Sequence, residues 1–127
     1  MEEQSTLEEL LRKSDERIAE LEKMKELGEA LERLHENEDF QKVILDGYFE
    51  KEAKRLFDIL VHPDMFKRDI MQNIQDKLTS IRSLKQFFGT TLQNAHMAPM
   101  QIEEEENYKR DISTRNPQEV AEIEGGE

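Results

Sequence analysis

The chain has 127 residues, of which 38% are charged and 35% are hydrophobic, with no Cys or Trp and a formal net charge of -12. This length allows one modest domain with a thin core, and the lack of Cys excludes disulfides, thiolate catalysis and thiolate metal ligation. The acidic balance opposes phosphate binding, so nucleic acid is a disfavoured partner and proteins are favoured ones. The composition is typical of a long helical or partly disordered protein, and less so of an enzyme with a deep pocket.

The first predicted element is a long amphipathic helix, coiled-coil-like, over residues 5–36. Ser5 and Thr6 each precede a glutamate by three residues, which is the pattern of a capping box. Its apolar stripe is Leu7, Leu11, Ser14, Ile18 and Leu21, continued by Met24, Leu27, Leu31 and Leu34. A narrow apolar stripe on a charged helix predicts packing against another helix. We expect Leu7, Leu11, Ile18, Leu21, Met24, Leu31 and Leu34 to bind a protein partner or a second copy.

The spacing within this stripe is irregular near residue 24. The steps from Leu21 to Met24 and from Met24 to Leu27 are both three residues, whereas a heptad alternates three with four. The stripe is therefore predicted to shift around the helix at this point, and a perfect coiled coil is not expected.

Residues 37–98 are predicted to form an antiparallel helical hairpin. Asn37 or Asp39 is suited to cap its first helix, which carries the densest apolar cluster of the chain. The predicted core of this helix is Phe40, Val43, Ile44, Leu45, Tyr48, Phe49, Leu56, Phe57, Leu60 and Val61. Because these residues do not alternate with period two, we expect a bent or closely packed helix through Asp46-Gly47 rather than strands.

The second helix of the hairpin is predicted to follow His62-Pro63-Asp64. Its apolar face consists of Ile70, Ile74, Leu78 or Ile81, Leu84 and Phe88. Pro99 is expected to end it. Residues 99–127, with the run Glu103 to Glu106, are then expected to be a disordered acidic tail. The predicted fold is all-α, with a long N-terminal helix, a helical hairpin and this tail.

Candidate chemistry is sparse. His35, His62 and His96 stand at predicted helix ends or turns, without metal-ligand spacing, so we expect no metal site and no cofactor. Glu103 to Glu106 lacks the spaced ligands of a calcium loop, and no nucleophile or glycine-rich loop accompanies carboxylates such as Glu50 and Asp58. The sequence therefore indicates a non-enzymatic protein.

One stretch of positive charge departs from the acidic average. It consists of Lys67, Arg68, Lys77, Arg82 and Lys85 in the predicted second hairpin helix. A phosphate-contacting face is one interpretation, and the solvated side of an amphipathic helix is the favoured one. The sequence also lacks an apolar run of membrane-spanning length, and Met1-Glu2-Glu3-Gln4 lacks the features of a secretory signal, so we expect neither.

One segment resembles a group of small tailed-bacteriophage proteins. It contains Asn37-Glu38-Asp39-Phe40, then Lys42-Val43-Ile44-Leu45-Asp46-Gly47-Tyr48-Phe49, Glu52-Ala53 and Arg55-Leu56, with a later helix from Ile74 to Phe88. The resemblance covers residues 27–90 and carries no catalytic residues. It implies a virion-associated structural, scaffold or chaperone-like assembly protein, present in the cytoplasm of an infected bacterium or in the virion, and binding head or tail components or its own copies. An acidic phage regulator that inhibits a host nucleic-acid-acting protein is the alternative.

Overall fold

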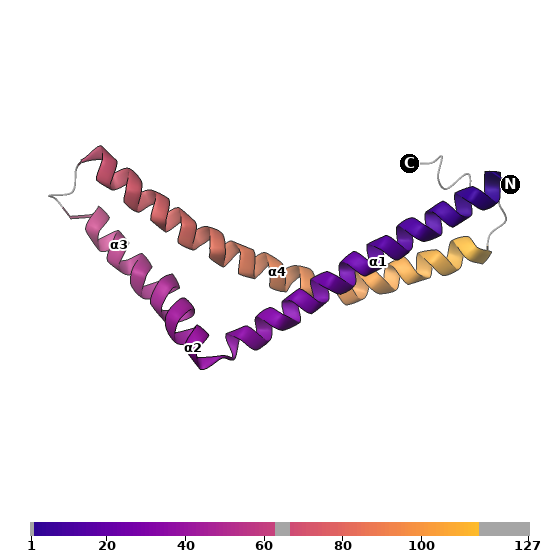
Figure 1. The fold of residues 1–127 in the computed structure, drawn as a ribbon, viewed down its shortest axis with the longest axis horizontal. Coiled ribbons are helices and arrows are strands. Elements are labelled where there is room, and N and C mark those ends of the chain that lie inside the picture. The colour runs from indigo at the N-terminus through magenta and orange to yellow at the C-terminus, as the bar shows by residue number, and fades with distance from the viewer. Residues whose placement is uncertain (1, 63–66, 115–127) are drawn as a thin grey trace. The chain divides into compact units, whose positions relative to one another are not determined.

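The computed structural model describes residues 2–62 and 67–114, with side chains from Thr6 onward, and each element in these ranges is a helix. The elements are α1 (Glu2–His35), α2 (Glu38–Phe40), η1 (Gln41–Glu52), α3 (Ala53–Leu60) and α4 (Arg68–Thr114) (Figure 1). The predicted all-α class and the long N-terminal helix are confirmed. The chain divides into unit 1, residues 1–27 and 94–127, and unit 2, residues 28–93.

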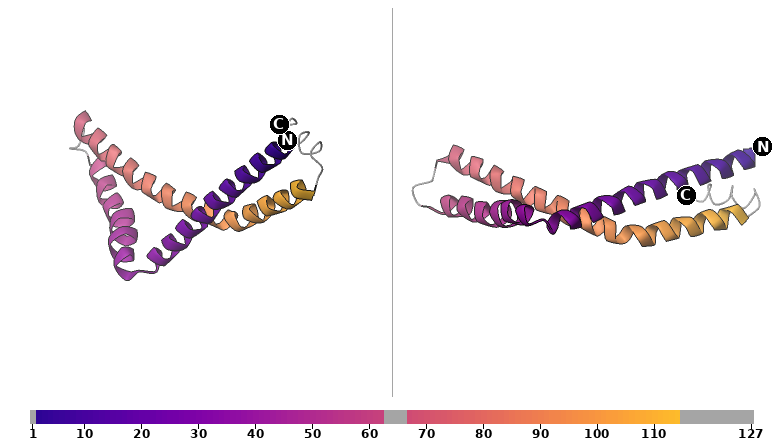
Figure 2. Two further views of the ribbon diagram at one scale, coloured as in Figure 1. Left: turned by 45° about the vertical axis from the view of Figure 1, so that its right-hand side comes forward. Right: turned by 60° about the horizontal axis from the view of Figure 1, so that its bottom comes forward.

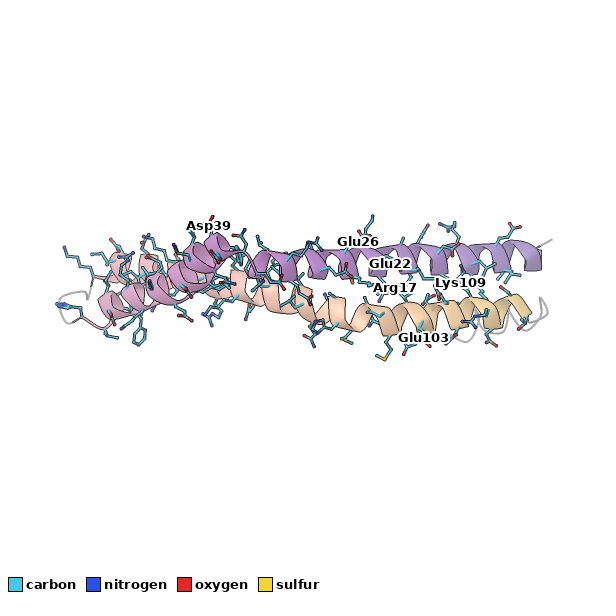
Figure 3. All side chains as sticks on the ribbon, turned by 90° about the horizontal axis from the view of Figure 1, so that it is seen from below. Arg17, Glu22, Glu26, Asp39, Glu103 and Lys109 are labelled. Atoms are coloured by element: carbon cyan, nitrogen blue, oxygen red, sulfur yellow. The ribbon has the colours of Figure 1, made fainter. Side chains whose placement is uncertain are left out.

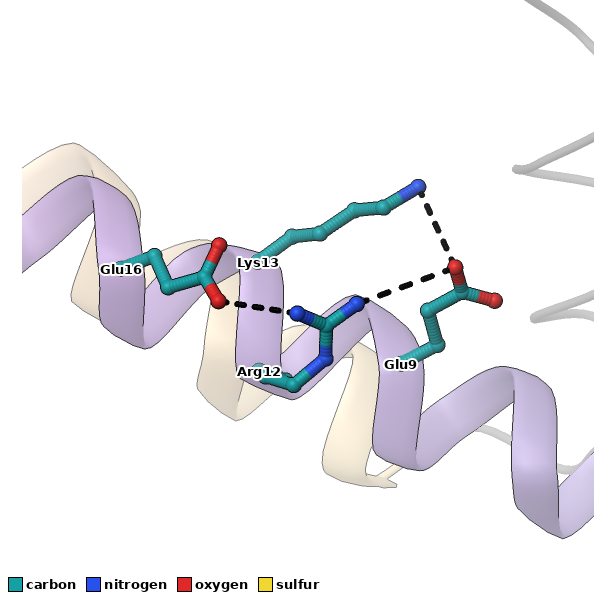
Figure 4. Close-up of polar contacts among 4 residues, drawn as sticks. All are labelled: Glu9, Arg12, Lys13 and Glu16. Carbon is teal, nitrogen blue, oxygen red and sulfur yellow. Dashed lines mark hydrogen bonds and ion pairs between the residues drawn. The ribbon is translucent and has the colours of Figure 1, made fainter.

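The outer side of helix α1 carries opposite charges about one turn apart, and these pairs stabilise an exposed helix. Arg12 lies between two glutamates, with Nη1 2.8 Å from Glu16 Oε1 and Nη2 4.0 Å from Glu9 Oε1, and Lys13 Nζ lies 3.7 Å from the same Glu9 oxygen (Figure 4). Such exposed pairs each contribute about 0.2–0.5 kcal/mol to helix stability. They favour helix formation without deciding what the apolar side of α1 contacts.

Within unit 1, α1 pairs antiparallel with the C-terminal part of α4, as Figures 1 and 3 show. Ser14 Oγ donates a hydrogen bond to Glu105 Oε1, and Lys109 Nζ donates to Asp15 Oδ1, which fixes the register of the two helices. The facing positions of α4 repeat in heptad steps of three and four. They are Ala95, Ala98, Ile102, Glu105, Lys109 and Ile112, all buried or half-buried. Unit 1 is therefore a two-helix antiparallel coiled coil.

The expectation that Pro99 ends the helix is wrong, because α4 continues through Pro99 to Thr114. Residues 99–114 are therefore helical rather than a disordered tail, and residues 115–127 lie outside the described residues. An internal proline costs a helix about 3 kcal/mol, since it lacks an N–H donor. Pro99 is exposed, whereas the side chains of Ala98 and Ile112 are 0% exposed. Burial of this seam against α1 offsets the cost.

The predicted shift of the α1 stripe near residue 24 is not seen in the pattern of burial. Ser14, Leu21 and Gly28 are buried and His35 is half-buried, so one series with steps of seven residues continues through this point. Leu27 and Leu34 are 53% and 43% exposed. The sequence stripe shifts while the buried side keeps its heptad spacing, so these two leucines lie outside the buried side.

Unit 2 contains the predicted helical hairpin (Figure 2). Asn37 caps its first helix, since Asn37 Oδ1 accepts a hydrogen bond of 2.9 Å from the Phe40 backbone N–H. The chain then continues without a break through η1 and α3 to Leu60, which confirms a helix through Asp46-Gly47. The hairpin core consists of Phe49, Leu56, Ile74 and Ile81, with further apolar side chains packed around it.

Element η1 is a π-helix, which winds more widely than an α-helix. Its inward-facing residues come in pairs four apart, Ile44-Leu45 and Tyr48-Phe49, and Glu52-Ala53 follows at the junction with α3. A repeat of four drifts around an α-helix of 3.6 residues per turn, but wider winding keeps it on one side. Gly47 lies in the middle, where a Cβ atom would stand 3.1 Å from the Lys42 carbonyl oxygen.

We predict that Leu21→Ala destabilises the protein by about 2–5 kcal/mol, because Leu21 is 1% exposed and its loss leaves a cavity in the coil. Leu27→Ala, on the same helix at a 53% exposed position, is the matched control and should change stability by less than about 0.5 kcal/mol. Urea denaturation followed by circular dichroism measures both. Equal effects of the two substitutions would contradict the register of the coil.

We predict that Pro99→Ala stabilises unit 1 by about 2–3 kcal/mol, because alanine restores an N–H donor inside α4 without changing the buried seam. Thermal or urea denaturation measures the gain. Met97→Ala, at a 41% exposed position two residues away, should be neutral within about 0.5 kcal/mol. A loss of stability in Pro99→Ala would show that the coil requires the proline.

Candidate interaction surface

Most of the residues that were expected to bind a partner are covered by the chain's own helices. Leu21 and Leu31 are buried, Leu7, Leu11, Ile18 and Met24 are half-buried, and only Leu34 of this set is exposed. Leu7, Leu11, Ile18, Leu21 and Met24 belong to unit 1, whereas Leu31 and Leu34 belong to unit 2. The burial of the five residues in unit 1 is explained within that unit, since α4 extends beyond Pro99 and packs along this part of α1.

Most of the exposed large apolar side chains in the described residues belong to unit 2. Val43, Phe57 and Val61 on its first arm are 62%, 56% and 61% exposed, and Phe87 on α4 is 56% exposed. The first three were predicted to be core residues, and this prediction is wrong because they are exposed, whereas Phe49 and Leu56 fill the core. Large apolar side chains in solvent are candidates for protein contact. These four residues are the candidate interaction surface of the chain.

An aromatic cluster packs where the end of α1, the first arm of the hairpin and α4 meet within unit 2. The His35 ring meets the rings of Phe40 and Phe88 edge-on, with centroids 5.4 Å and 5.7 Å apart, and Phe88 also contacts Phe49 at 5.6 Å. His35 Nδ1 lies 2.8 Å from the Leu31 carbonyl oxygen, which anchors the ring to α1. These contacts join the end of α1, the first arm and α4 within unit 2, so the arm is presented on a fixed base.

The predicted basic stretch, Lys67 just before α4 and four residues within it, is exposed to solvent. Lys67, Arg68, Lys77, Arg82 and Lys85 are all exposed, and Asp69 and Asp76 alternate with them. The Lys85 ammonium lies 5.5 Å from the centre of the Phe49 ring, so part of this charge serves the hairpin itself. The arrangement favours the structural interpretation of these residues over a phosphate-contacting one.

A small polar hollow lies on the described part of the hairpin. A surface hollow of about 210 Å³ is lined by Tyr48, Glu52, Leu56, Lys77, Ser80 and Ile81. At its edge, Arg55 Nε donates a 3.0 Å hydrogen bond to Glu52 Oε2, and this contact lowers the pKa of Glu52. A carboxylate with a lowered pKa stays ionised and is a poor general acid or base at neutral pH. Glu52 is thus a structural partner of Arg55.

Acidic charge is concentrated in the coil. Residues 1–27 and 94–114 carry 14 acidic and 7 basic side chains, whereas residues 28–93 carry 12 and 10. Glu22, Glu26 and Glu103 are among the exposed carboxylates of unit 1 (Figure 3). In the described part of the chain, His, Asp and Glu side chains form no group of three suited to hold a metal ion. The hairpin is therefore the near-neutral, apolar unit, and the coil is the charged one.

Among the described helices, none combines the length and the apolar character that a membrane-spanning segment needs. Comparison of the chain with protein families, characterised proteins and solved structures finds no match.

Proposed function

We propose that this protein is a non-enzymatic helical interaction protein that acts in the assembly of a tailed-phage virion, as a structural, scaffold or chaperone-like component. The observation that carries the proposal is the exposure of large apolar side chains on the hairpin, with Val43, Phe57, Val61 and Phe87 in solvent. The resemblance of residues 27–90 to small phage proteins supplies the biological setting. Head or tail proteins and further copies of the chain are the proposed partners, in the cytoplasm of the infected cell or in the particle.

The energetics suit reversible association. A few exposed apolar residues on a charged helical surface give a small interface, and small interfaces are typical of transient complexes. The charged coil adds solubility and opposes non-specific contact between copies, because its net charge is strongly negative. A protein that attaches to and leaves a growing particle requires both properties.

A second candidate function is an acidic regulator that binds the basic site of a host nucleic-acid-acting protein. The excess of acidic side chains in the coil favours it. Such binding would weaken steeply as salt is raised, since it depends on exposed charges, whereas binding through the candidate interaction surface would change little. The salt dependence of partner binding therefore separates the two functions.

We predict that a tagged copy expressed during phage infection is recovered with purified proheads, virions or tails, and that Phe57→Ala reduces this recovery several-fold. Quantitative mass spectrometry of the particles measures the amount. Glu16→Gln, an exposed change on the coil, is the control and should leave recovery unchanged. Recovery of host polymerase or nuclease subunits, with the protein missing from all particles, would contradict the assembly role and favour the regulator.

A further inference from the structure

Unit 1 has exposed apolar side chains of its own, apart from those of the hairpin. Leu27, Met97 and Met100 are 53%, 41% and 57% exposed, and Met24 is half-buried. Leu27 and Met24 belong to α1, and the other two belong to α4. The register of the coiled coil decides whether these four side chains share one side of it.

Two pairs of facing residues define that register. Ser14 of α1 is hydrogen-bonded to Glu105 of α4. Leu21 and Ala98 are each seven residues from this pair, in the directions that an antiparallel arrangement requires, and both are buried. We therefore take these four as the facing residues of the seam between the two helices.

Positions beside the seam follow from the winding of an α-helix, which turns by about 100° per residue. A residue one or four positions after a facing residue lies on one side of the seam. A residue three or six positions after it, or one position before it, lies on the other side. Asp15 and Lys109 are at offsets of one and four, and their hydrogen bond shows that equal offsets meet on the same side of this antiparallel pair.

The four apolar residues lie on the side of the seam opposite to that hydrogen bond. Met24 and Leu27 are three and six positions after the facing residue of α1. Met97 is one position before the facing residue of α4, and Met100 is two after it, at the outer edge of the same side. At 1.5 Å per residue they extend over about 12 Å of the coil. We call these four residues the methionine patch.

The charge of unit 1 favours a basic partner for this patch. Residues 1–27 and 94–114 carry 14 acidic and 7 basic side chains. On the side of the patch, α4 carries Glu104 and Asp111 and no basic residue. On that side α1 carries three residues of each sign, Glu9, Lys13, Glu16, Arg17, Glu20 and Lys23. The net negative charge repels a second acidic coil and attracts a helix with basic side chains.

We propose that the methionine patch binds a basic amphipathic helix of a partner protein, which lies along α1 and α4 within unit 1. The apolar side of that helix contacts the patch, whose methionines are flexible enough to adapt to it. Its basic side chains approach the carboxylates of the coil. The patch offers about two helical turns of contact, so the complex is small and reversible. The inference goes beyond the proposed function, because the candidate interaction surface belongs to unit 2.

A methyl NMR titration of the full chain, labelled at its methionine methyl groups, tests the site. The probe is a helical peptide of leucine and lysine with its leucines on one side, and a peptide with glutamate in place of each lysine is the control. We expect saturable shifts at Met24, Met97 and Met100 with the basic peptide only, and none at Met71 of the hairpin. No shifts, or equal shifts at Met71, would overturn the site. Equal binding of the acidic peptide would overturn the proposed charge of the partner.

Calorimetry with the same basic peptide tests the patch by substitution. Met97→Gln combined with Met100→Gln should weaken binding about tenfold, because two apolar anchors are lost. Val43→Gln combined with Phe57→Gln, at hairpin positions of 62% and 56% exposure, is the matched control and should leave binding unchanged. Circular dichroism checks that both variants are folded, which the exposure of these positions predicts. Undiminished binding by the methionine variant would overturn the proposal.

Sedimentation equilibrium tests the other occupant of the patch, a second copy of the chain. A wild-type dimer that the methionine variant returns to the 15.0 kDa monomer would overturn the proposal in favour of self-association. These outcomes are independent of the assembly role. Peptide binding with the predicted pattern supports the inference also where phage particles contain no copy of the protein, and that result would contradict only the proposed function.

Discussion

The fold depends on the burial of the α1 stripe by the C-terminal part of α4. Without α4 beyond Pro99, Leu7, Leu11, Ile18 and Leu21 would form an apolar stripe about 20 Å long in solvent. With it, Leu21 and Ile112 are among the least exposed side chains of the chain. The same pairing holds the 47-residue helix α4 together across its proline. One helix pair therefore buries the apolar stripe of α1 and stabilises α4 across Pro99.

The polar residues in this seam make the coiled coil less stable than one with a fully apolar core. Ser14 and Glu105 occupy core positions and are joined by a hydrogen bond, and Lys109 at the next core position bonds to Asp15. Polar core residues lower the stability of a coiled coil but specify its register and orientation. Ala95 and Ala98 bring the helices close with little apolar area. The seam thus defines which helix α1 pairs with, at the cost of some stability.

The sequence pattern was sufficient to predict the helical class, a cap at Asn37 or Asp39, and the hairpin. It failed at Pro99, because the local cost of a proline is visible in the sequence whereas the compensating contact comes from residues about 80 positions earlier. The heptad spacing from Ala95 to Ile112 was present in the sequence. A search for apolar residues misses this spacing, because its members include alanine, glutamate and lysine.

The candidate surface was harder to predict than the fold. The first arm has apolar residues around much of its circumference, so density alone assigns Val43, Phe57 and Val61 to the core together with Phe49 and Leu56. The outward position of Val43 depends on the winding of η1, and a stretch of π-helix has no simple sequence signal. Residues that recur every four positions from Phe40 to Leu56 are the sequence pattern that would have indicated the wider winding of η1.

The most direct test of this account is an engineered disulfide between Ser14→Cys and Glu105→Cys in the cysteine-free chain. The two side chains are hydrogen-bonded in the coil, so oxidation of the dilute protein should link them within one chain, at unchanged mass and with raised thermal stability. A matched pair of Asp15→Cys with Glu103→Cys on the outer side of α4 should not link. Links only between chains, or none at all, would contradict the closure of α1 by its own α4.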